Sequence, residues 1–469
     1  MVFSSTVFLF IFLPAVWLLY TLIPKRYLGA RNFLLAAASL FFYAYGEPVY
    51  IIIMLASVFF NYVMSMLMTR FADTAASAIC TLCVVTDLAV LAFFKYVPWL
   101  VTLANGAFGL DIPVPPYTIP VGISFYTFQI LSYVVDVRCG KTEVQTKFFD
   151  LLLYISFFPQ LIAGPIVKYG DIKDQIGARE VTVDGTARGI RRFICGLAKK
   201  VIISNTAAVV AEAAFKAAEP SSVLLWAGAV CYCIQLYFDF SGYSDMAIGL
   251  AHIFGFELLE NFNYPYAATC IRDFWKRWHI SLTSWFREYV YFPLGGNRKG
   301  KVRTIFNRLA VFFLTGLWHG ANFTYIIWGM WHGLLMLLEE VAGIEQLAKK
   351  KALQPIFRLY TLLAVCLGFV VFNSPSMSFA LDYIGGMFRF SGAPGDMLAL
   401  MTPYTVLMLV LGVILSLPVL PKVRALLARD ARTERIGEIA GYALTLPLFA
   451  LCVMTLASTS FNPFIYYIF

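Results

Sequence analysis

The stretch LWHGANFTYIIWGMWHG, from Leu317 to Gly333, contains the tripeptide Trp-His-Gly twice, with histidines at positions 319 and 332. The whole chain of 469 residues has only four histidines. An ionisable side chain within an apolar stretch is costly unless it has a partner or a function. Whether His319 and His332 are structural or functional therefore depends on the kind of protein in which they lie.

The composition is that of a membrane protein. Hydrophobic residues make up 60% of the chain and charged residues 13%, whereas soluble domains carry about 25% charge. The mean hydropathy is +0.75, and apolar runs of about 20 residues recur from end to end, each long enough to cross a hydrocarbon core of roughly 30 Å. We therefore expect an all-α polytopic membrane protein. The net charge of +9 is typical of basic cytoplasmic loops and does not indicate a nucleic-acid partner.

Apolar runs give twelve candidate spans along the chain. They lie at 6–23, 32–46, 49–69, 79–97, 118–137, 221–239, 242–258, 306–319, 321–341, 356–373, 401–420 and 437–458. About eleven of them are expected to be true spans, because several are short enough to be re-entrant. Lys25 and Arg26 follow the first span, which predicts an external N-terminus. The segment 98–117 is expected to be external.

The segment 148–167 is interrupted by proline and glycine and lies between two basic clusters. A re-entrant element is the simplest account, and such broken backbone is tolerated at membrane depth only where protein or a wet cavity covers it. We expect one domain, 1–469, built around a central cavity. Its regions are N-terminal helices (1–140), a catalytic core with re-entrant and amphipathic segments (141–345) and C-terminal helices (346–469).

The segment RDFWKRWHISLTSWFREYVYFPLGGNRKG, from Arg272 to Gly300, predicts one amphipathic helix at the membrane surface, which ends at Pro293 and Gly295-Gly296. At about 100° per residue, a basic stripe that includes His279 lies beside an aromatic side. One interpretation is an interfacial anchor that contacts membrane lipids through their anionic headgroups. The other is a cavity mouth whose cations bind the phosphates of a coenzyme A ester. The candidate phosphate-binding residues are Arg272, Lys276, Arg277 and Arg287.

His319 is expected to lie deep in the membrane. A helix that starts near Arg308 climbs about 17 Å by His319, which is close to the middle of a core of roughly 30 Å. Gly316, Gly320 and Asn322 favour a helix break there. A neutral imidazole at that depth is suited to take a proton from a hydroxyl group.

The remaining histidines and the cysteines are expected to be structural. His332 is predicted to lie nearer the surface than His319, and His252 lies on an apolar face. The chain has nine scattered cysteines. The pairs Cys80/Cys83 and Cys231/Cys233 lie in apolar runs without nearby histidines, so small buried side chains are the simplest explanation for them. His319 and His332 lack the spacing of metal ligands, so no metal site is predicted.

Five long stretches of the chain resemble the membrane-bound O-acyltransferase (MBOAT) family. They are PVGISFYTFQILSYVVDV (120–137), FFPQLIAGPIVKYGDI (157–172), YFDFSGYSDMAIGLAHIFG (237–255), DFWKRWHISLTSWFREYVYFPLGGNR (273–298) and LTGLWHGANFTYIIWGMWHG (314–333). The opening MVFSS and the closing FNPFIYYIF are similar to the alginate O-acetyltransferase branch. The resemblance covers nearly the whole chain in order.

The resemblance implies an enzyme that passes an acyl group from a cytoplasmic donor through the membrane to an extracytoplasmic acceptor. In this branch the group is acetyl, the donor substrate is expected to be acetyl-CoA, and no bound cofactor is expected. The acceptor is an alginate-like exopolysaccharide or peptidoglycan, a partner acetyltransferase outside the membrane completes the transfer, and the location is the bacterial inner membrane. The family's catalytic histidine falls on His319 and a second functional histidine on His279.

The stretch VVFNSPSMSFALDYIGG (370–386) departs from the family pattern, because relatives commonly carry an aromatic-Phe-Arg-Ala sequence there. No role for this region is therefore carried over from relatives. The glutamate in WFREYVY, where aspartate is usual, is a milder change.

The mechanistic hypothesis makes His319 the general base, an effect typically worth about 10²–10⁴-fold in rate. Trp318 and Trp331 would line a dry channel that protects the thioester from water. Asn322 is a candidate oxyanion donor. The other candidate channel residues are His332, Asp239 and Asp245, and both aspartates are expected to belong to a polar network.

Three alternatives stay open on the sequence alone. A glycan or lipid exporter shares the cavity, although the halves of the chain show no repeat. A scaffold subunit would only recruit a secreted acetyltransferase. A D-alanyl transferase of teichoic acids would use the thioester of a carrier protein as its donor.

Overall fold

The computed structural model describes residues 1–393 and 395–458, which form helices and no strand. The closing motif FNPFIYYIF lies outside the described residues. The chain divides into two compact units. Unit 1 comprises residues 1–193 and 246–259, and unit 2 comprises the described residues of 194–245 and 260–458. The single domain with three successive regions that the sequence suggests stays a prediction.

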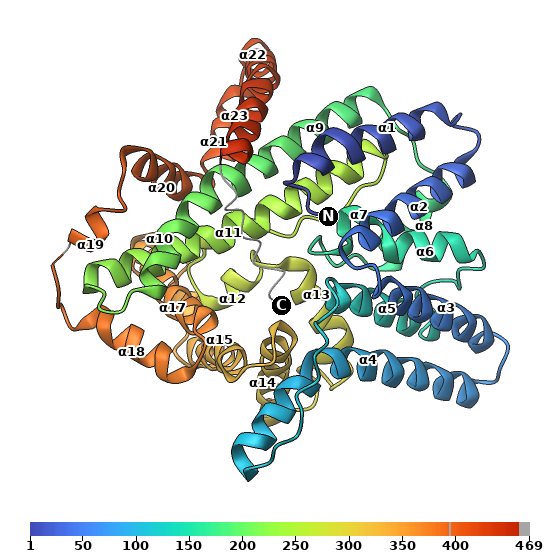
Figure 1. The fold of residues 1–469 in the computed structure, drawn as a ribbon, viewed down its shortest axis with the longest axis horizontal. Helices are drawn as coiled ribbons and strands as arrows, with labels where there is room; N and C mark the ends of the chain where they lie inside the picture. Colours follow the sequence, from blue (N-terminus) through green and yellow to red (C-terminus); the bar gives the residue numbers. More distant parts are fainter. Residues whose placement is uncertain (394, 459–469) are drawn as a thin grey trace. The chain divides into compact units, whose positions relative to one another are not determined.

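Unit 1 contains the N-terminal helices (Figure 1). They are η1 (Phe8–Phe12), α1 (Leu13–Leu22), α2 (Leu28–Gly46), α3 (Ile51–Met68), α4 (Asp73–Phe108), α5 (Ile123–Arg138), α6 (Phe148–Ser156), α7 (Phe158–Leu161), α8 (Tyr169–Gly177) and most of α9 (Val183–Ala198). Aromatic side chains form much of its core, where the Phe12 and Phe158 rings meet edge to face with 5.4 Å between centroids. Helix α4 continues to Phe108, so the first part of the segment 98–117 is helical, and its external position stays a prediction.

The break expected in 148–167 is confirmed. Helix α6 ends at Ser156, and Phe157 leaves the helical conformation with φ −50° and ψ 107°. Helix α7 then begins with a proline in its first turn, where the missing N–H costs nothing. The residues on both sides of the break are buried, as irregular backbone at membrane depth requires. Its re-entrant path through the bilayer stays a prediction.

Unit 2 contains the remaining helices (Figure 1). They are η2 (Lys199–Ser204), α10 (Asn205–Lys216), α11 (Ser222–Ile253) up to residue 245, η3 (Pro265–Ala267), α12 (Ile271–Trp275), α13 (Ile280–Phe286), η4 (Arg287–Tyr291), α14 (Lys301–His319), α15 (Phe323–Val341), α16 (Ile344–Leu347), η5 (Lys351–Leu353), α17 (Gln354–Asn373), α18 (Met377–Phe388), α19 (Gly395–Leu398), α20 (Pro403–Leu415), α21 (Val419–Leu427), α22 (Ala431–Ala443) and α23 (Thr445–Ser458).

Six described helical runs are long and apolar enough to cross a membrane, or seven if the pair α20 and α21, bent by 67°, forms one span. The expected number of eleven spans is therefore not confirmed. The candidates 221–239 and 242–258 were wrongly separated, because they form the single helix α11. Gly242 does not break α11. A Cβ at Gly242 would lie 2.8 Å from the carbonyl oxygen of Gly196, so the glycine allows close helix packing.

The run Val183–Lys216, of 34 residues, passes the same test but is missing from the candidate spans. It consists of α9, the π-helical turn η2 and α10. Its charged first half is typical of a cytoplasmic loop, which hid the apolar second half. Two of its lysines are neutralised within unit 2. Lys200 pairs with Asp239 at 2.6 Å and Lys199 with Asp245 at 2.6 Å.

The single amphipathic helix expected from Arg272 to Pro293 is wrong. The segment forms three short pieces, α12, α13 and η4. Helix α12 ends at Trp275. His279 has φ 44°, in the left-handed backbone region that residues other than glycine rarely adopt. A projection at about 100° per residue therefore does not hold across His279, and the residues of the expected basic stripe do not share one helix face.

Candidate active site

The two Trp-His-Gly copies lie on two neighbouring helices. Helix α14 ends at His319, Gly320 is extended with φ −177°, and the Asn322 side chain accepts a hydrogen bond from the Thr324 N–H to cap α15. The helix break expected near Gly316, Gly320 and Asn322 is therefore confirmed. Helices α14 and α15 lie side by side (Figure 1).

Glycines allow these two helices to touch. A Cβ at Gly316 would overlap the carbonyl oxygen of Tyr325, and a Cβ at Gly329 would overlap that of Phe312. Such close backbone approach through small residues is typical of helix pairs in membranes. It brings the Trp-His-Gly copy of α14 next to that of α15.

Both copies contact the indole of Trp328. The His319 ring lies 5.0 Å from the Trp328 ring, and the His332 ring lies 5.3 Å from it. Phe372 approaches His319 to 5.3 Å between centroids, and Trp275 approaches His332 to 5.4 Å. Both histidines are buried, with 4% of His319 and none of His332 exposed. Aromatic faces and edges therefore surround both imidazoles and keep bulk water away from them.

His279 lies in the same aromatic surroundings. Its ring is 6.0 Å from the Trp318 ring, which in turn is 4.9 Å from the His319 ring. We call His279, Trp318, His319, Trp328, His332 and Trp275 the histidine cluster. Burial lowers the pKa of the His279 imidazole to about 3, so this ring is neutral at pH 7 and one of its nitrogens can accept a hydrogen bond.

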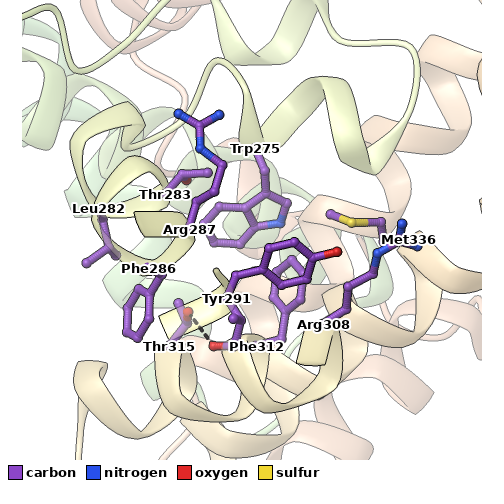
Figure 2. A pocket seen from close by; sticks show the side chains of 11 residues that line it. Trp275, Leu282, Thr283, Phe286, Arg287, Tyr291, Arg308, Phe312, Thr315 and Met336 are labelled. Atoms are coloured by element: carbon purple, nitrogen blue, oxygen red, sulfur yellow. Dashed lines mark hydrogen bonds between the residues drawn. The ribbon is translucent and has the colours of Figure 1, made fainter. Parts of the chain in front are cut away.

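A cavity of about 130 Å³ adjoins the histidine cluster (Figure 2). It is lined by Trp275, Leu282, Thr283, Phe286, Arg287, Tyr291, Arg308, Val311, Phe312, Thr315 and Met336. Trp275 belongs to both, because its ring contacts Phe312 at 5.5 Å and His332 at 5.4 Å. Arg287 and Arg308 both line this largely apolar cavity, and Figure 2 shows the guanidinium group of Arg287 pointing away from the other labelled side chains. The arrangement suits an apolar chain that carries a negative charge.

The structure separates the four candidate phosphate-binding residues. Arg272 pairs with Glu345 at 2.7 Å and with Glu340 at 3.0 Å. Lys276 lies 3.9 Å from Glu345, and Arg277 pairs with Asp273 at 2.9 Å. Of these four residues, only Arg287 lines the cavity, and within the described residues no carboxylate neutralises it.

Sequence reasoning missed Arg308 as a cavity residue. Arg308 lines the cavity and also pairs with Glu340. Its position one helical turn before Phe312 is the signal that was available, but it was treated only as a mark of the membrane surface.

The other candidate residues differ in their distance from the histidine cluster. Trp318 and His332 belong to it. Trp331 does not, because it is 37% exposed and donates its indole N–H to the Ala364 carbonyl oxygen at 3.0 Å. Asn322 donates an N–H of its amide group to the Pro375 carbonyl oxygen at 2.9 Å, so one of its two N–H groups is already used. Asp239 and Asp245 form the ion pairs with Lys200 and Lys199.

Two further residues of the site were not anticipated. Trp328 lies one helical turn before His332, and that spacing alone could have indicated a shared face. Asn261 is fully buried and contacts the ring of His279. No local pattern announces Asn261, since it lies 18 residues from His279 in sequence.

The sequence matches the model of the MBOAT, membrane-bound O-acyltransferase family, over residues 141–378. A probable alginate O-acetylase of Pseudomonas aeruginosa is 43% identical over 83% of this chain and 75% of its own length. A probable alginate O-acetylase of Azotobacter vinelandii is 38% identical over 100% of both chains. A peptidoglycan O-acetyltransferase of Helicobacter pylori is 34% identical over 84% of this chain and 80% of its own.

The matched region contains the histidine cluster and the cavity, and the apolar helices on both sides of it are those of a multi-pass membrane protein. The chain therefore belongs to the membrane-bound O-acyltransferase family and is itself an O-acyltransferase.

Proposed function

We propose that this O-acyltransferase carries an acetyl group from cytoplasmic acetyl-CoA to hydroxyl groups of a polysaccharide outside the bacterial inner membrane, with its N-terminus outside. The acceptor is an alginate-like exopolysaccharide or peptidoglycan. Relatives named for alginate and peptidoglycan acetylation support this choice, since they match more than four fifths of the chain. A separate acetyltransferase outside the membrane completes the transfer.

The observation that carries the proposal is the position of His319 at the end of α14, inside the histidine cluster. In the reaction, the acceptor oxygen attacks the thioester carbon while its proton passes to His319. The C–S bond then breaks, and the departing thiolate takes the proton. An imidazole in this role is worth about 10²–10⁴-fold in rate, and the aromatic surroundings protect the thioester from water.

The cavity beside Trp275 is the proposed donor site. Its apolar walls suit the pantetheine arm of coenzyme A, and Arg287, which lines the cavity without a carboxylate partner in the described residues, suits the phosphates. Trp275 links this cavity to His332 and Trp328, so a thioester at the inner end of the cavity would lie next to the histidine cluster.

The test is incubation of purified protein with radiolabelled acetyl-CoA, the acceptor polymer and the partner acetyltransferase. Wild type is expected to label the polymer, and His319→Ala to label it at least 100-fold more slowly. His252→Gln serves as a control, because His252 lies on α11 outside the histidine cluster. Equal labelling by wild type and His319→Ala would disprove the role of His319.

The same experiment separates the alternatives. An exporter would move the glycan across the membrane without consuming acetyl-CoA. A scaffold subunit would support labelling even when both His279 and His319 are replaced. A teichoic acid D-alanyl transferase would transfer D-alanine from its carrier-protein thioester and leave acetyl-CoA intact.

A further inference from the structure

Asn261 holds the strained turn that carries His279. The Asn261 carbonyl oxygen accepts the backbone N–H of Ile280 at 3.0 Å. Its side-chain oxygen accepts the Ser281 backbone N–H at 3.1 Å and the Ser281 hydroxyl at 2.9 Å. Strained backbone persists only where its surroundings over-determine it, and it is common at functional sites. These bonds therefore explain how His279, a residue other than glycine, keeps a backbone φ of 44°.

The same bonds fix the orientation of the Asn261 amide group. A backbone N–H can only donate, so the Asn261 atom that faces the Ser281 N–H must be the oxygen Oδ1. That oxygen also lies 3.3 Å from Nδ1 of His279. Because Oδ1 can only accept, Nδ1 must carry the hydrogen of the neutral ring. The other nitrogen, Nε2, therefore presents a lone pair.

Nε2 of His279 is buried, and in the described part of the chain no side chain or backbone group donates to it. The ring contacts Phe240 of α11 at 4.7 Å and Trp318 of α14 at 6.0 Å, neither of which ionises. The charged residue next to Phe240 on α11 is Asp239, which pairs with Lys200 of η2. A buried acceptor that lacks a donor within the protein is suited to receive one from a substrate.

We propose that Asn261 is a positioning residue that fixes His279 as the Nδ1–H tautomer, so that Nε2 accepts a hydrogen bond from an O–H or N–H group of the substrate. The proposal rests on the proposed acyl-transfer function in one respect, namely which substrate donates the hydrogen bond to Nε2. The tautomer itself follows from the bonds between Asn261, Ser281 and His279.

Nitrogen NMR tests the tautomer without any need for activity. Protein labelled with ¹⁵N-histidine has only four imidazoles to resolve, and His279→Gln identifies the signals of His279. Wild type is expected to show a protonated Nδ1 and an unprotonated Nε2 at His279. Asn261→Ala is expected to give a mixture of tautomers or the Nε2–H form. A wild-type His279 with its hydrogen on Nε2 would overturn the proposal, whatever the activity of the protein.

Kinetics distinguishes positioning from mere support of the turn. Asn261→Ala is expected to lower kcat about 100-fold with little change in KM for acetyl-CoA. Asn261→Asp keeps an acceptor oxygen for both Ser281 and His279, so its kcat is expected to stay within about tenfold of wild type. Its carboxylate also raises the pKa of the imidazole, which moves the acid limb of the pH–rate profile to higher pH.

Asn263→Ala is the matched control, since Asn263 lies two residues further on and is exposed. Each variant is first checked for folding by size-exclusion chromatography. A pH–rate profile that Asn261→Asp leaves unchanged would show that Asn261 only supports the turn. Wild-type protein with the expected tautomer but no acetyl transfer would contradict the proposed function and leave the role of Asn261 standing.

Discussion

The turn between α14 and α15 and the turn between α12 and α13 each place a histidine at the boundary of a helix, but different forces set them. Gly320 and Asn322, next to His319, encode the first turn locally. The second turn contains no glycine, and Asn261 holds it from 18 residues away. A turn fixed by local residues can therefore be predicted from the sequence, whereas a turn fixed by hydrogen bonds from a distant residue cannot.

The largest expected effect is at the contact of α14 with α15. Gly316→Leu forces a side chain into the carbonyl oxygen of Tyr325, so the helices must separate and little folded protein is expected, at a cost of several kcal/mol. Expression and thermal unfolding in detergent measure the effect. Gly106→Leu is the control, since a Cβ there meets nothing within 4 Å. Equal stability of both variants would contradict the tight contact.

The second prediction concerns pH and the turn at His279. Folding lowers the pKa of His279 to about 3, whereas an unfolded histidine has a pKa of about 6.5. The unfolded chain therefore binds a proton that the folded chain does not bind. The free energy of unfolding should fall as the pH drops below about 6.5, by up to about 1.4 kcal/mol per pH unit.

Thermal unfolding of wild type and His279→Gln between pH 7.5 and pH 5 measures this slope. As the pH falls across that range, the free energy of unfolding of wild type should decrease more than that of His279→Gln. A constant difference would mean that His279 titrates normally and is not enclosed as described.

A smaller effect is expected at Glu339, which ties the end of α15 to the start of α12. Its two carboxylate oxygens accept the Ile271 N–H at 2.8 and 3.0 Å. Glu339→Ala leaves that buried donor without an acceptor, which costs about 1–3 kcal/mol. Glu339→Gln keeps one acceptor oxygen and should cost less. Melting temperatures check the order, and a loss in Glu339→Gln as large as that in Glu339→Ala would contradict the reading of this bond.

The smallest effect is expected at the cavity arginines. Arg287→Ala removes a cation that lines the cavity, so the KM for acetyl-CoA should rise about fivefold, which corresponds to about 1 kcal/mol, with kcat unchanged. Arg272→Ala is the comparison, because its guanidinium is bound by Glu340 and Glu345. Steady-state kinetics with varied donor and varied acceptor concentrations measures KM and kcat for both variants. A larger KM effect for Arg272 would restore the basic stripe expected from the sequence.

Composition, apolar runs and family motifs predicted the helical membrane fold. They also singled out His319, whose catalytic role stays a prediction. Local signals also predicted the breaks at Phe157 and Gly320, since proline and glycine act on their own neighbours. The pairing of Lys200 with Asp239 could not be predicted, because it depends on how two helices pack. Without that pairing, the charges before Ile202 are typical of a loop, and the long run Val183–Lys216 is missed.

The glycines of the α14–α15 contact also limit how this enzyme can be redesigned. A larger acyl group needs extra space beside His319, and the backbone atoms that meet at Gly316 and Gly329 have no side chain left to shorten. The wall formed by Trp275 and Phe312, in contrast, has large side chains that can be shortened. Any engineered change in acyl-chain length should therefore map to that wall, while the seam between the two helices stays fixed.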